Sequence, residues 1–456
     1  MTTQNQTANF FISHFGLTPN QGQKAALEAL AGFVQPENTS NCFILSGPAG
    51  SGKTSLLRSV ISWLNENDLD FSLSAPTGRA AQIAGKKTQT VATTLHRLLF
   101  TIQVQDDPLQ VSFIPRNNEK HDDIRYYLVD EASMISDKAS RDGMFVQSLS
   151  LLAQLIQFAR QGNPRNKIIF IGDEFQLPPV HSIFSPALSA SYLADTYKMD
   201  ADGFRLSTVE RTGESSYILT NAHNILESIT SGSAINRLTC NTTSSFSNGI
   251  KRYLTDFSTD PFNQAIMIAL ANSQVNALNT WARNFRYNYK NSFDIMPDEC
   301  MICNSNTDLD GHLLFKGNHF TVRKTWKPEE FAGLHFINAE IAFDNHNNER
   351  VYANTKILLE SVSNGDGMLT FDQEKGLIHE AYRRNKQFRE SRRTTDDAFI
   401  NAVRARYGYA ITCHKAQGGE WKNVYLHPGY RQDDPRWLYT AVTRAVNELY
   451  TWTEKK

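Results

Sequence analysis

The strongest chemical signal in the sequence is a glycine-rich loop that ends in lysine and threonine. Residues 47–54 read Gly-Pro-Ala-Gly-Ser-Gly-Lys-Thr and fit the pattern G-x-x-x-x-G-K-[ST]. Glycines let the backbone curl so that its N–H groups point at phosphate oxygens, and the following helix adds the positive end of its dipole. Lys53 can reach the β- and γ-phosphates, and Thr54 can place its hydroxyl on Mg²⁺. The predicted nucleotide contacts are Gly47, Pro48, Ala49, Gly50, Ser51, Gly52, Lys53, Thr54 and Ser55.

Two polar segments, each directly after an apolar run, could complete this site. Asp130 could hold Mg²⁺ through water, and Glu131 could deprotonate the water that attacks the γ-phosphate. Asp173 and Gln176 follow a later run, where strand ends meet the phosphates in a doubly wound sheet. The alternatives are an acidic helix start for the first segment and a plain turn for the second. Their position after the glycine loop favours the catalytic interpretation.

The elements that must position these residues are short apolar runs alternating with helical spacing. This alternation predicts a parallel sheet covered on both faces. A second alternating set follows, and it is interrupted by β-rich pieces with Gly and Asn turns. The predicted strands of the first set are 42–45, 71–74, 126–129 and 167–171, with helices at 53–66 and 144–161; the second set comprises 264–270, 274–287, 407–412, 423–425 and 448–453.

The composition is typical of a soluble globular protein but does not indicate a binding partner. The 456 residues are 40% hydrophobic and 20% charged, with a formal net charge of −1, so bulk charge gives no hint of a nucleic-acid partner. No apolar run approaches the ~20 residues that span a bilayer, and residues 1–8 lack signal-peptide character, so we expect a cytoplasmic protein without a membrane partner. The chain has five cysteines, an odd and sparse set that does not favour a disulfide framework. Cys300 and Cys303 form a lone C-x-x-C without two further zinc ligands, which favours a structural role.

Taken in order, these segments resemble the superfamily 1B helicases, in the RecD-like and Dda-like group that moves 5′ to 3′ on DNA. The segment 407–421, Tyr-Gly-Tyr-Ala-Ile-Thr-Cys-His-Lys-Ala-Gln-Gly-Gly-Glu-Trp, is the most specific match after the glycine loop. The other matching segments are 23–27, 75–81, 94–98, 130–134, 176–179, 210–211, 271–279 and 438–445.

The resemblance implies roles for particular residues. Gln23 would read adenine: it fits by the residues that follow it, whereas Gln21 fits by its distance from Leu17. Arg211 and Arg444 would be arginine fingers, whereas a lone arginine more often makes a surface salt bridge. The catalytic set is then Lys53, Asp130, Glu131, Gln176, Arg211 and Arg444, with Thr54 and Asp130 on the metal and Gly419 and Glu420 sensing nucleotide; the nucleic-acid contacts would be Pro76, Thr77, Arg79, Thr94, His96, Asn272, Thr412, His414 and Lys415.

Several of these residues have plainer explanations. Thr77 and Thr94 could be helix N-caps. The cation-rich stretch 383–393 could track phosphates or form a solvated helix face. Aromatic side chains could stack on bases or lie in the core. The aromatic candidates are Phe100, Phe113 and Trp421.

The fold implied is α/β, with two RecA-like P-loop motor domains built on parallel sheets. The first would carry a small β-hairpin pin insertion, and the second a small β-barrel-like insertion. The pin has no recognisable tip motif, which leaves strand-separation strength open. The predicted boundaries are 1–97 with 118–195 for motor domain one, 98–117 for the pin, 196–299 with 400–456 for motor domain two, and 300–399 for the β-rich insertion.

The function predicted is an ATP-dependent helicase that uses Mg²⁺ and moves along single-stranded and forked DNA in replication or repair. ATP would bind between the two motor domains, and single-strand-binding or other replication and repair proteins would be partners. Three alternatives stay open: a single-strand translocase that displaces proteins with weak unwinding, an RNA-directed helicase of the same superfamily, and a P-loop kinase or nucleotide-gated binding module. The last explains Lys53 but not the segment 407–421.

Overall fold

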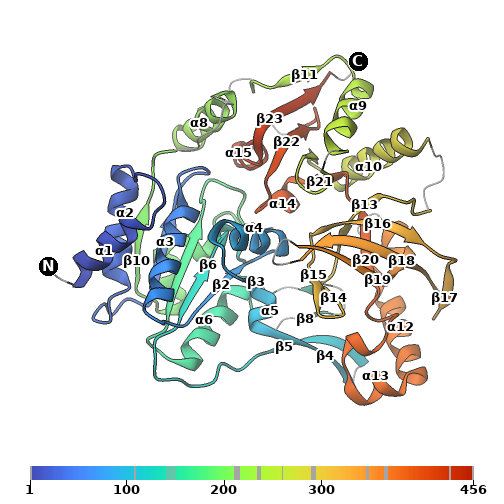
Figure 1. Cartoon of the computed structure of the whole chain (residues 1–456), viewed down its shortest axis with the longest axis horizontal. Helices are drawn as coiled ribbons and strands as arrows, with labels where there is room; N and C mark the ends of the chain where they lie inside the picture. The colour runs from blue at the N-terminus through green and yellow to red at the C-terminus, as the bar shows by residue number, and fades with distance from the viewer. Residues whose placement is uncertain are drawn as a thin grey trace. The chain divides into compact units, whose positions relative to one another are not determined.

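A computed structural model gives the fold of the chain (Figure 1). By contacts the chain divides into two compact units, which are taken in turn. Unit 1 comprises residues 1–101, 115–140 and 148–212, and unit 2 comprises residues 102–114, 141–147 and 213–456. The structure describes residues 3–106, 109–139, 141–142, 145–146, 149–209, 216–233, 238–258, 260–288, 294–345, 349–363, 368–430 and 433–453, with the backbone alone at 102–106, 109–113, 141–142, 145–146 and 216.

Unit 1 is built on a six-stranded sheet in the order β10-β1-β9-β6-β2-β3, with every neighbouring pair parallel. The central strands are buried along their whole length, as expected for a sheet covered on both faces. All strands therefore end at one edge, where the predicted chemistry gathers. The strands are β1 (Cys42–Ser46), β2 (Phe71–Ala75), β3 (Ala92–Thr94), β6 (Tyr126–Val129), β9 (Lys167–Gly172) and β10 (Ala201–Arg205).

The helices of unit 1 cover this sheet with one apolar stripe each. In α3 the residues Leu56, Leu57, Val60, Ile61 and Leu64 recur at helical spacing, and all are buried in the core against the sheet. The helices are α1 (Thr3–Ser13), α2 (Gln21–Phe33), α3 (Lys53–Glu66), α4 (Gly78–Thr88), α5 (Leu95–Leu99), α6 (Leu151–Gly162) and α7 (Ala190–Tyr197), with 3₁₀ turns η1 (Ala132–Met134) and η2 (Pro186–Leu188).

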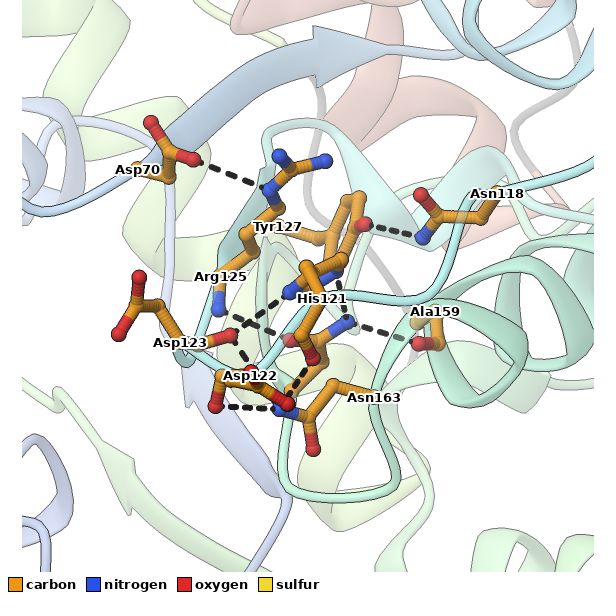
Figure 2. Close-up of polar contacts among 10 residues, drawn as sticks. Asp70, Asn118, His121, Asp122, Asp123, Arg125, Tyr127, Ala159 and Asn163 are labelled. Atoms are coloured by element: carbon orange, nitrogen blue, oxygen red, sulfur yellow. Dashed lines mark hydrogen bonds and ion pairs between the residues drawn. The ribbon is translucent and has the colours of Figure 1, made fainter.

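At the opposite edge of the sheet, asparagine side chains fix the start of β6 (Figure 2). The Asn163 amide donates to the carbonyls of His121, Asp122 and Asp123 at 3.0–3.3 Å. Asn118 donates to the Tyr127 hydroxyl at 2.7 Å. These contacts anchor the segment that leads into β6, whose other end carries the acidic pair.

Unit 2 contains a second parallel sheet, in the order β11-β23-β22-β12-β21. Its core gathers aromatic side chains such as Tyr253, Tyr409 and Tyr425. The strands are β11 (Asn241–Thr243), β12 (Ala265–Ala269), β21 (Ala410–Thr412), β22 (Trp421–Leu426) and β23 (Ala445–Trp452); the helices are α8 (Ser216–Ser231), α9 (Phe246–Phe257), α10 (Asn272–Tyr287), α14 (Cys413–Ala416) and α15 (Pro435–Val442).

A β-barrel is inserted into unit 2 between α10 and β21. Its sheet runs β16-β13-β20-β19-β18-β17, and a further β16–β18 pairing closes the ring. Two helices, α12 and the shorter α13, follow the last long hairpin (Figure 1). The elements are β13 (Glu299–Cys303), β14 (Thr307–Leu309), β15 (His312–Leu314), β16 (His319–Thr325), β17 (Glu329–Phe331), β18 (Leu334–Asp344), β19 (Arg350–Leu358), α11 (Leu359–Ser363), α12 (Phe371–Arg384), α13 (Lys386–Ser391), η3 (Thr394–Asp396) and β20 (Val403–Tyr407).

Two short hairpins remain. Strands β4 (Phe100–Asp106) and β5 (Leu109–Pro115) pair where a pin was predicted, and β7 (Arg141–Asp142) pairs with β8 (Phe145–Val146). By contacts, residues 102–114 group with unit 2.

The predicted fold class is confirmed: two parallel sheets, a hairpin insertion and a barrel insertion are present. Three predicted boundaries are wrong. The first domain extends beyond residue 195, because β10 pairs with β1. The insertion extends beyond residue 399, because β20 belongs to the barrel sheet. The helix expected from residue 144 begins at Leu151, where Ser150 caps it. In the described part of the chain, every helix is too short or too polar to cross a membrane.

Candidate nucleotide site and nucleic-acid interface

The glycine loop lies between the end of β1 and the start of α3, and two of its glycines admit no side chain. Gly52 has a φ of +91°, and a Cβ there would lie 2.6 Å from Nε2 of Gln23. A Cβ on Gly47 would lie 2.8 Å from Cβ of Leu206 and 2.9 Å from its carbonyl oxygen. The loop backbone therefore lies close to the Gln23 side chain on one flank and to Leu206 on the other, and glycine makes this close approach possible.

Two side-chain donors of this loop, Lys53 and Ser51, could bind an anion. The Lys53 ammonium donates to the carbonyls of Gly47 at 2.7 Å and Pro48 at 2.9 Å. The Ser51 hydroxyl is buried, and among the described residues nothing bonds to it. A buried hydroxyl without a partner is costly, and a phosphate oxygen would satisfy it. These donors fit the phosphates of a nucleotide.

The side-chain amide of Gln23 makes its hydrogen bonds within the protein rather than being open to a nucleotide base. Its side chain accepts from the Asn20 backbone N–H at 3.0 Å, and Asn20 accepts from the Gln23 N–H at 2.8 Å, which makes a capping box for α2. The Gln23 amide also donates to the Ser51 carbonyl at 3.1 Å, and the side chain is buried. Gln21, in contrast, is exposed on the first turn of α2. The pattern N-x-x-Q before an apolar run could have indicated this capping role.

The acidic pair stands where β6 ends, at the edge that carries the glycine loop. The Asp130 N–H donates to the Ser74 carbonyl of β2 at 2.9 Å, and Asp130 Oδ1 accepts from the Glu131 N–H at 2.9 Å. Glu131 has a φ of +51°, a left-handed conformation that costs a non-glycine residue about 1–2 kcal/mol. Such a conformation aims the Glu131 side chain in a direction that extended backbone would not allow.

Asp173 and Gln176 follow β9, which lies between β1 and β6. Both side chains are buried. Asp173 accepts from the Phe175 N–H at 3.0 Å and from the Gln176 amide at 3.4 Å. The Gln176 Oε1 atom is buried, and no described residue donates to it. The glycine loop, the acidic pair and Gln176 thus follow three adjacent strands at one edge.

The predicted nucleic-acid contacts of unit 1 lie at the same edge and also act as caps. Thr77 follows β2 and accepts from the Ala80 N–H at 3.2 Å, and Thr94 ends β3 and accepts from the Arg97 N–H at 3.2 Å. A hydroxyl that accepts in a cap can still donate to a phosphate. Of the others, Pro76 is half-buried after β2, Arg79 is buried in α4, and His96 is half-buried in α5 with its ring 5.9 Å from that of Phe100.

In unit 2 the structure joins Arg444 to the segment 407–421. The Arg444 guanidinium is buried and donates to the carbonyls of Thr440 at 3.0 Å and Gly419 at 3.1 Å, and to the Thr443 hydroxyl at 3.1 Å. Two predicted site residues, Gly419 and Arg444, are therefore in contact. Glu420 beside them is half-buried.

The predicted contacts of unit 2 stand at strand ends. Thr412 ends β21 at the start of α14, and His414 and Lys415 are exposed on that short helix. Although the residue is exposed overall, the surrounding protein partly desolvates the His414 imidazole and lowers its pKa, against an opposing effect of Asp434. Asn272 is the first residue of α10, after β12.

Some predicted residues fall elsewhere. Arg211 and the Phe113 side chain lie outside the described residues. Phe100 and Trp421 are buried, which supports core roles for both. Cys303 is a buried strand residue, and burial raises the pKa of its thiol to about 11.

Comparisons with known proteins agree with this geometry. The chain matches the AAA domain family over residues 18–239 and the UvrD-like helicase C-terminal domain over residues 407–451. It is 25% identical to the RecBCD enzyme subunit RecD of Buchnera aphidicola, over 91% of this chain and 71% of RecD. It is 28% identical to the ATP-dependent RecD2 DNA helicase of Deinococcus radiodurans, over 46% of this chain but 25% of RecD2. A solved Pif1 helicase from Bacteroides, in complex with ADP-AlF3 and ssDNA, shares the fold with a TM-score of 0.51 and 15% identity, covering 95% of this chain and 92% of that one.

The parallel sheets and the phosphate cradle with its acidic pair define a P-loop ATPase of the RecA-like motor class. Within that class, the chain is similar in sequence to the helicases RecD and RecD2 of superfamily 1B and shares its fold with a Pif1 helicase.

Proposed function

We propose that this protein is an ATP-dependent DNA helicase that translocates 5′ to 3′ on single-stranded DNA and opens the duplex ahead of it. The observation that carries this proposal is the edge of the unit 1 sheet. There the glycine loop, the acidic pair and Gln176 follow adjacent strands, while the threonine caps of α4 and α5 follow the next two. A shift of the glycine loop or the acidic pair on ATP binding or hydrolysis can therefore move the threonine caps, because only neighbouring strands of one sheet lie between them.

The residues of this chain divide the work of hydrolysis. Bound Mg²⁺-ATP supplies the γ-phosphoryl group and its counter-ion, which Thr54 and Asp130 would hold. The Lys53 ammonium leaves the carbonyls of Gly47 and Pro48 and donates to phosphate oxygens instead, and the buried Ser51 hydroxyl donates to a further phosphate oxygen. Glu131 takes the proton of the attacking water, and Gln176 orients that water through its buried Oε1. Arg211 and Arg444 are proposed as arginine fingers.

Strand displacement on tailed duplexes tests the proposal. We expect opening of a duplex with a 5′ single-stranded DNA tail, much slower opening of the 3′-tailed duplex, and ATP hydrolysis that rises with added single-stranded DNA. Lys53→Ala should abolish both activities while single-stranded DNA still binds. Faster opening of the 3′-tailed duplex would exclude the proposed polarity. Hydrolysis indifferent to DNA would exclude the helicase function, and RNA-tailed duplexes report the preference between the two nucleic acids.

A further inference from the structure

The helix pair α12–α13 concentrates positive charge in a chain that is close to neutral. Residues 371–393 carry seven cationic side chains against four carboxylates, a net charge of +3, whereas the whole chain has −1. The cations are Lys375, Arg383, Arg384, Lys386, Arg389, Arg392 and Arg393. Local charge of this kind can attract a polyanion even when the overall charge gives no sign of one.

This helix pair is held firmly on the barrel, so its charged face is presented in a fixed place. Leu377, Ile378 and Phe388 are buried in a core that also contains strand residues of the barrel. The Glu374 carboxylate is buried and accepts a bidentate contact from Arg404 of β20. The Glu374 carboxylate is therefore paired inside the fold and does not neutralise the exposed cations.

The remaining carboxylates cover the outer cations only in part. Glu380 alone pairs with both Arg383 and Arg384, whose side chains stay more than 60% exposed. Lys386 is 3.8 Å from Glu390 and 78% exposed. The Arg389 guanidinium donates to two backbone carbonyls at 3.4 Å, which do not cancel its charge. Exposed pairs of this kind contribute little to stability and can exchange partners at low cost.

A hollow beside α13 shows which face a polyanion would use. It has a volume of about 830 Å³, lies between the helix pair and the barrel strands, and is lined by Asp308, Asp310 and Asp396, and by Lys356, whose ammonium is paired with Glu329. These carboxylates repel phosphate. Arg389 lies on the side of α13 away from Gln387, which lines the hollow. The outer face of the pair is therefore the one that suits an anionic partner.

We propose that the outer face of α12–α13 is an accessory contact for the phosphate backbone of the nucleic acid on which the motor acts. The inference rests on the proposed helicase function, because that function brings a polyanion to this chain. Arginine suits the partner, since its planar guanidinium binds phosphate oxygens in pairs. The contact carries no sequence information and adds affinity that depends on salt.

The salt dependence of DNA binding tests this inference. The variant Lys386→Gln/Arg389→Gln/Arg393→Gln removes three cations, and Lys120→Gln/Lys198→Gln/Lys251→Gln removes three exposed lysines from other places in the chain. For each protein, log K is measured against log salt with a forked duplex and with single-stranded oligo-dT. Loss of three phosphate contacts lowers the slope by about 2 to 3, since each contributes about 0.9 on duplex and about 0.7 on single strands.

We expect the lower slope for the α13 variant only, with the maximal DNA-stimulated ATPase rate unchanged. A change on the fork but not on oligo-dT assigns the contact to the duplex arm, and a change on both assigns it to the single strand. Arg389→Lys/Arg393→Lys should keep the wild-type slope. Equal slopes for wild type and the α13 variant overturn the inference and point to an acidic protein partner. If wild-type ATPase ignores DNA, the proposed function itself fails.

Discussion

At the scale of single residues, the assignment of Gln23 changes most between sequence and structure. The sequence offers Gln21 and Gln23 for one role, because each fits the family pattern by a different criterion. In the structure, the Gln23 amide binds the Asn20 backbone and the Ser51 carbonyl, so it braces the phosphate loop against α2. Gln21 is exposed and remains the candidate for adenine. We therefore propose a positioning role for Gln23 and a reading role for Gln21.

The KM values for ATP and GTP distinguish a residue that positions the phosphate loop from one that reads the base. Gln23→Ala removes a buried hydrogen bond to the phosphate loop, which is worth about 0.5–1.5 kcal/mol and predicts a KM raised roughly 2- to 10-fold for ATP and GTP alike. Gln21→Ala should raise KM for ATP and leave that for GTP unchanged. Steady-state hydrolysis of both nucleotides is the measurement. A selective effect of Gln23→Ala on ATP would show that Gln23 reads the base.

At the scale of elements, Lys167 ties the start of β9 to the turn before β1. Its ammonium donates to the carbonyls of Phe33 at 2.8 Å, Asn38 at 3.0 Å and Ser40 at 3.2 Å, and the side chain is 2% exposed. The ammonium also lies 4.5 Å from the Phe33 ring centroid. Burial lowers the pKa of Lys167 to about 8, against an opposing effect of Asp202.

This pKa gives a signed prediction for stability. The unfolded lysine titrates near 10.5, so between pH 8 and 10.5 the unfolded state binds more protons than the folded state. The unfolding free energy therefore gains up to about 1.4 kcal/mol per pH unit from this group as pH rises. Lys167→Met should be less stable than wild type at pH 7 by about 1–3 kcal/mol per carbonyl left unpaired.

Urea unfolding at several pH values measures the effect. The stability gap between wild type and Lys167→Met should widen from pH 8 to pH 10, and the comparison cancels the titration of buried tyrosines present in both proteins. Lys198→Met, at an exposed lysine, should show a gap that does not change with pH. A constant gap for Lys167→Met would mean that its ammonium keeps an ordinary pKa.

At the scale of the whole molecule, local pattern predicted the elements better than their grouping. The range of α3 and the end of β6 follow from helical spacing and from an apolar run, which are local signals. The pairing of β10 with β1 and of β20 with the barrel depends on contacts between distant segments, which no local pattern encodes. The site follows the same division. The motifs predict Lys53 and Glu131 as site residues, whereas the contact of Gln23 with the phosphate loop and the partners of Arg444 depend on tertiary packing.

One such long-range contact joins the barrel to the motor sheet within unit 2. Arg283 of α10 donates to the Glu299 carboxylate of β13 at 3.1 Å, and both side chains are buried. The Tyr409 hydroxyl donates to the same carboxylate at 2.8 Å, and the guanidinium lies 3.9 Å from the Tyr407 ring centroid. Burial raises the pKa of Glu299, while Arg283 and Tyr409 favour its ionised form. A buried charge in this position depends on its partner.

Breaking this pair should uncouple the barrel from the sheet. Glu299→Leu leaves the Arg283 charge buried without its partner, so we expect unit 2 to lose about 3–5 kcal/mol of unfolding free energy. Replacing both partners, as Arg283→Met/Glu299→Leu, should recover most of that loss, because apolar side chains of similar volume can substitute for a buried ion pair. Denaturant unfolding of wild type, both single variants and the double variant gives the coupling energy. If the double variant loses as much as the two single losses added together, the pair acts independently and does not couple barrel to sheet.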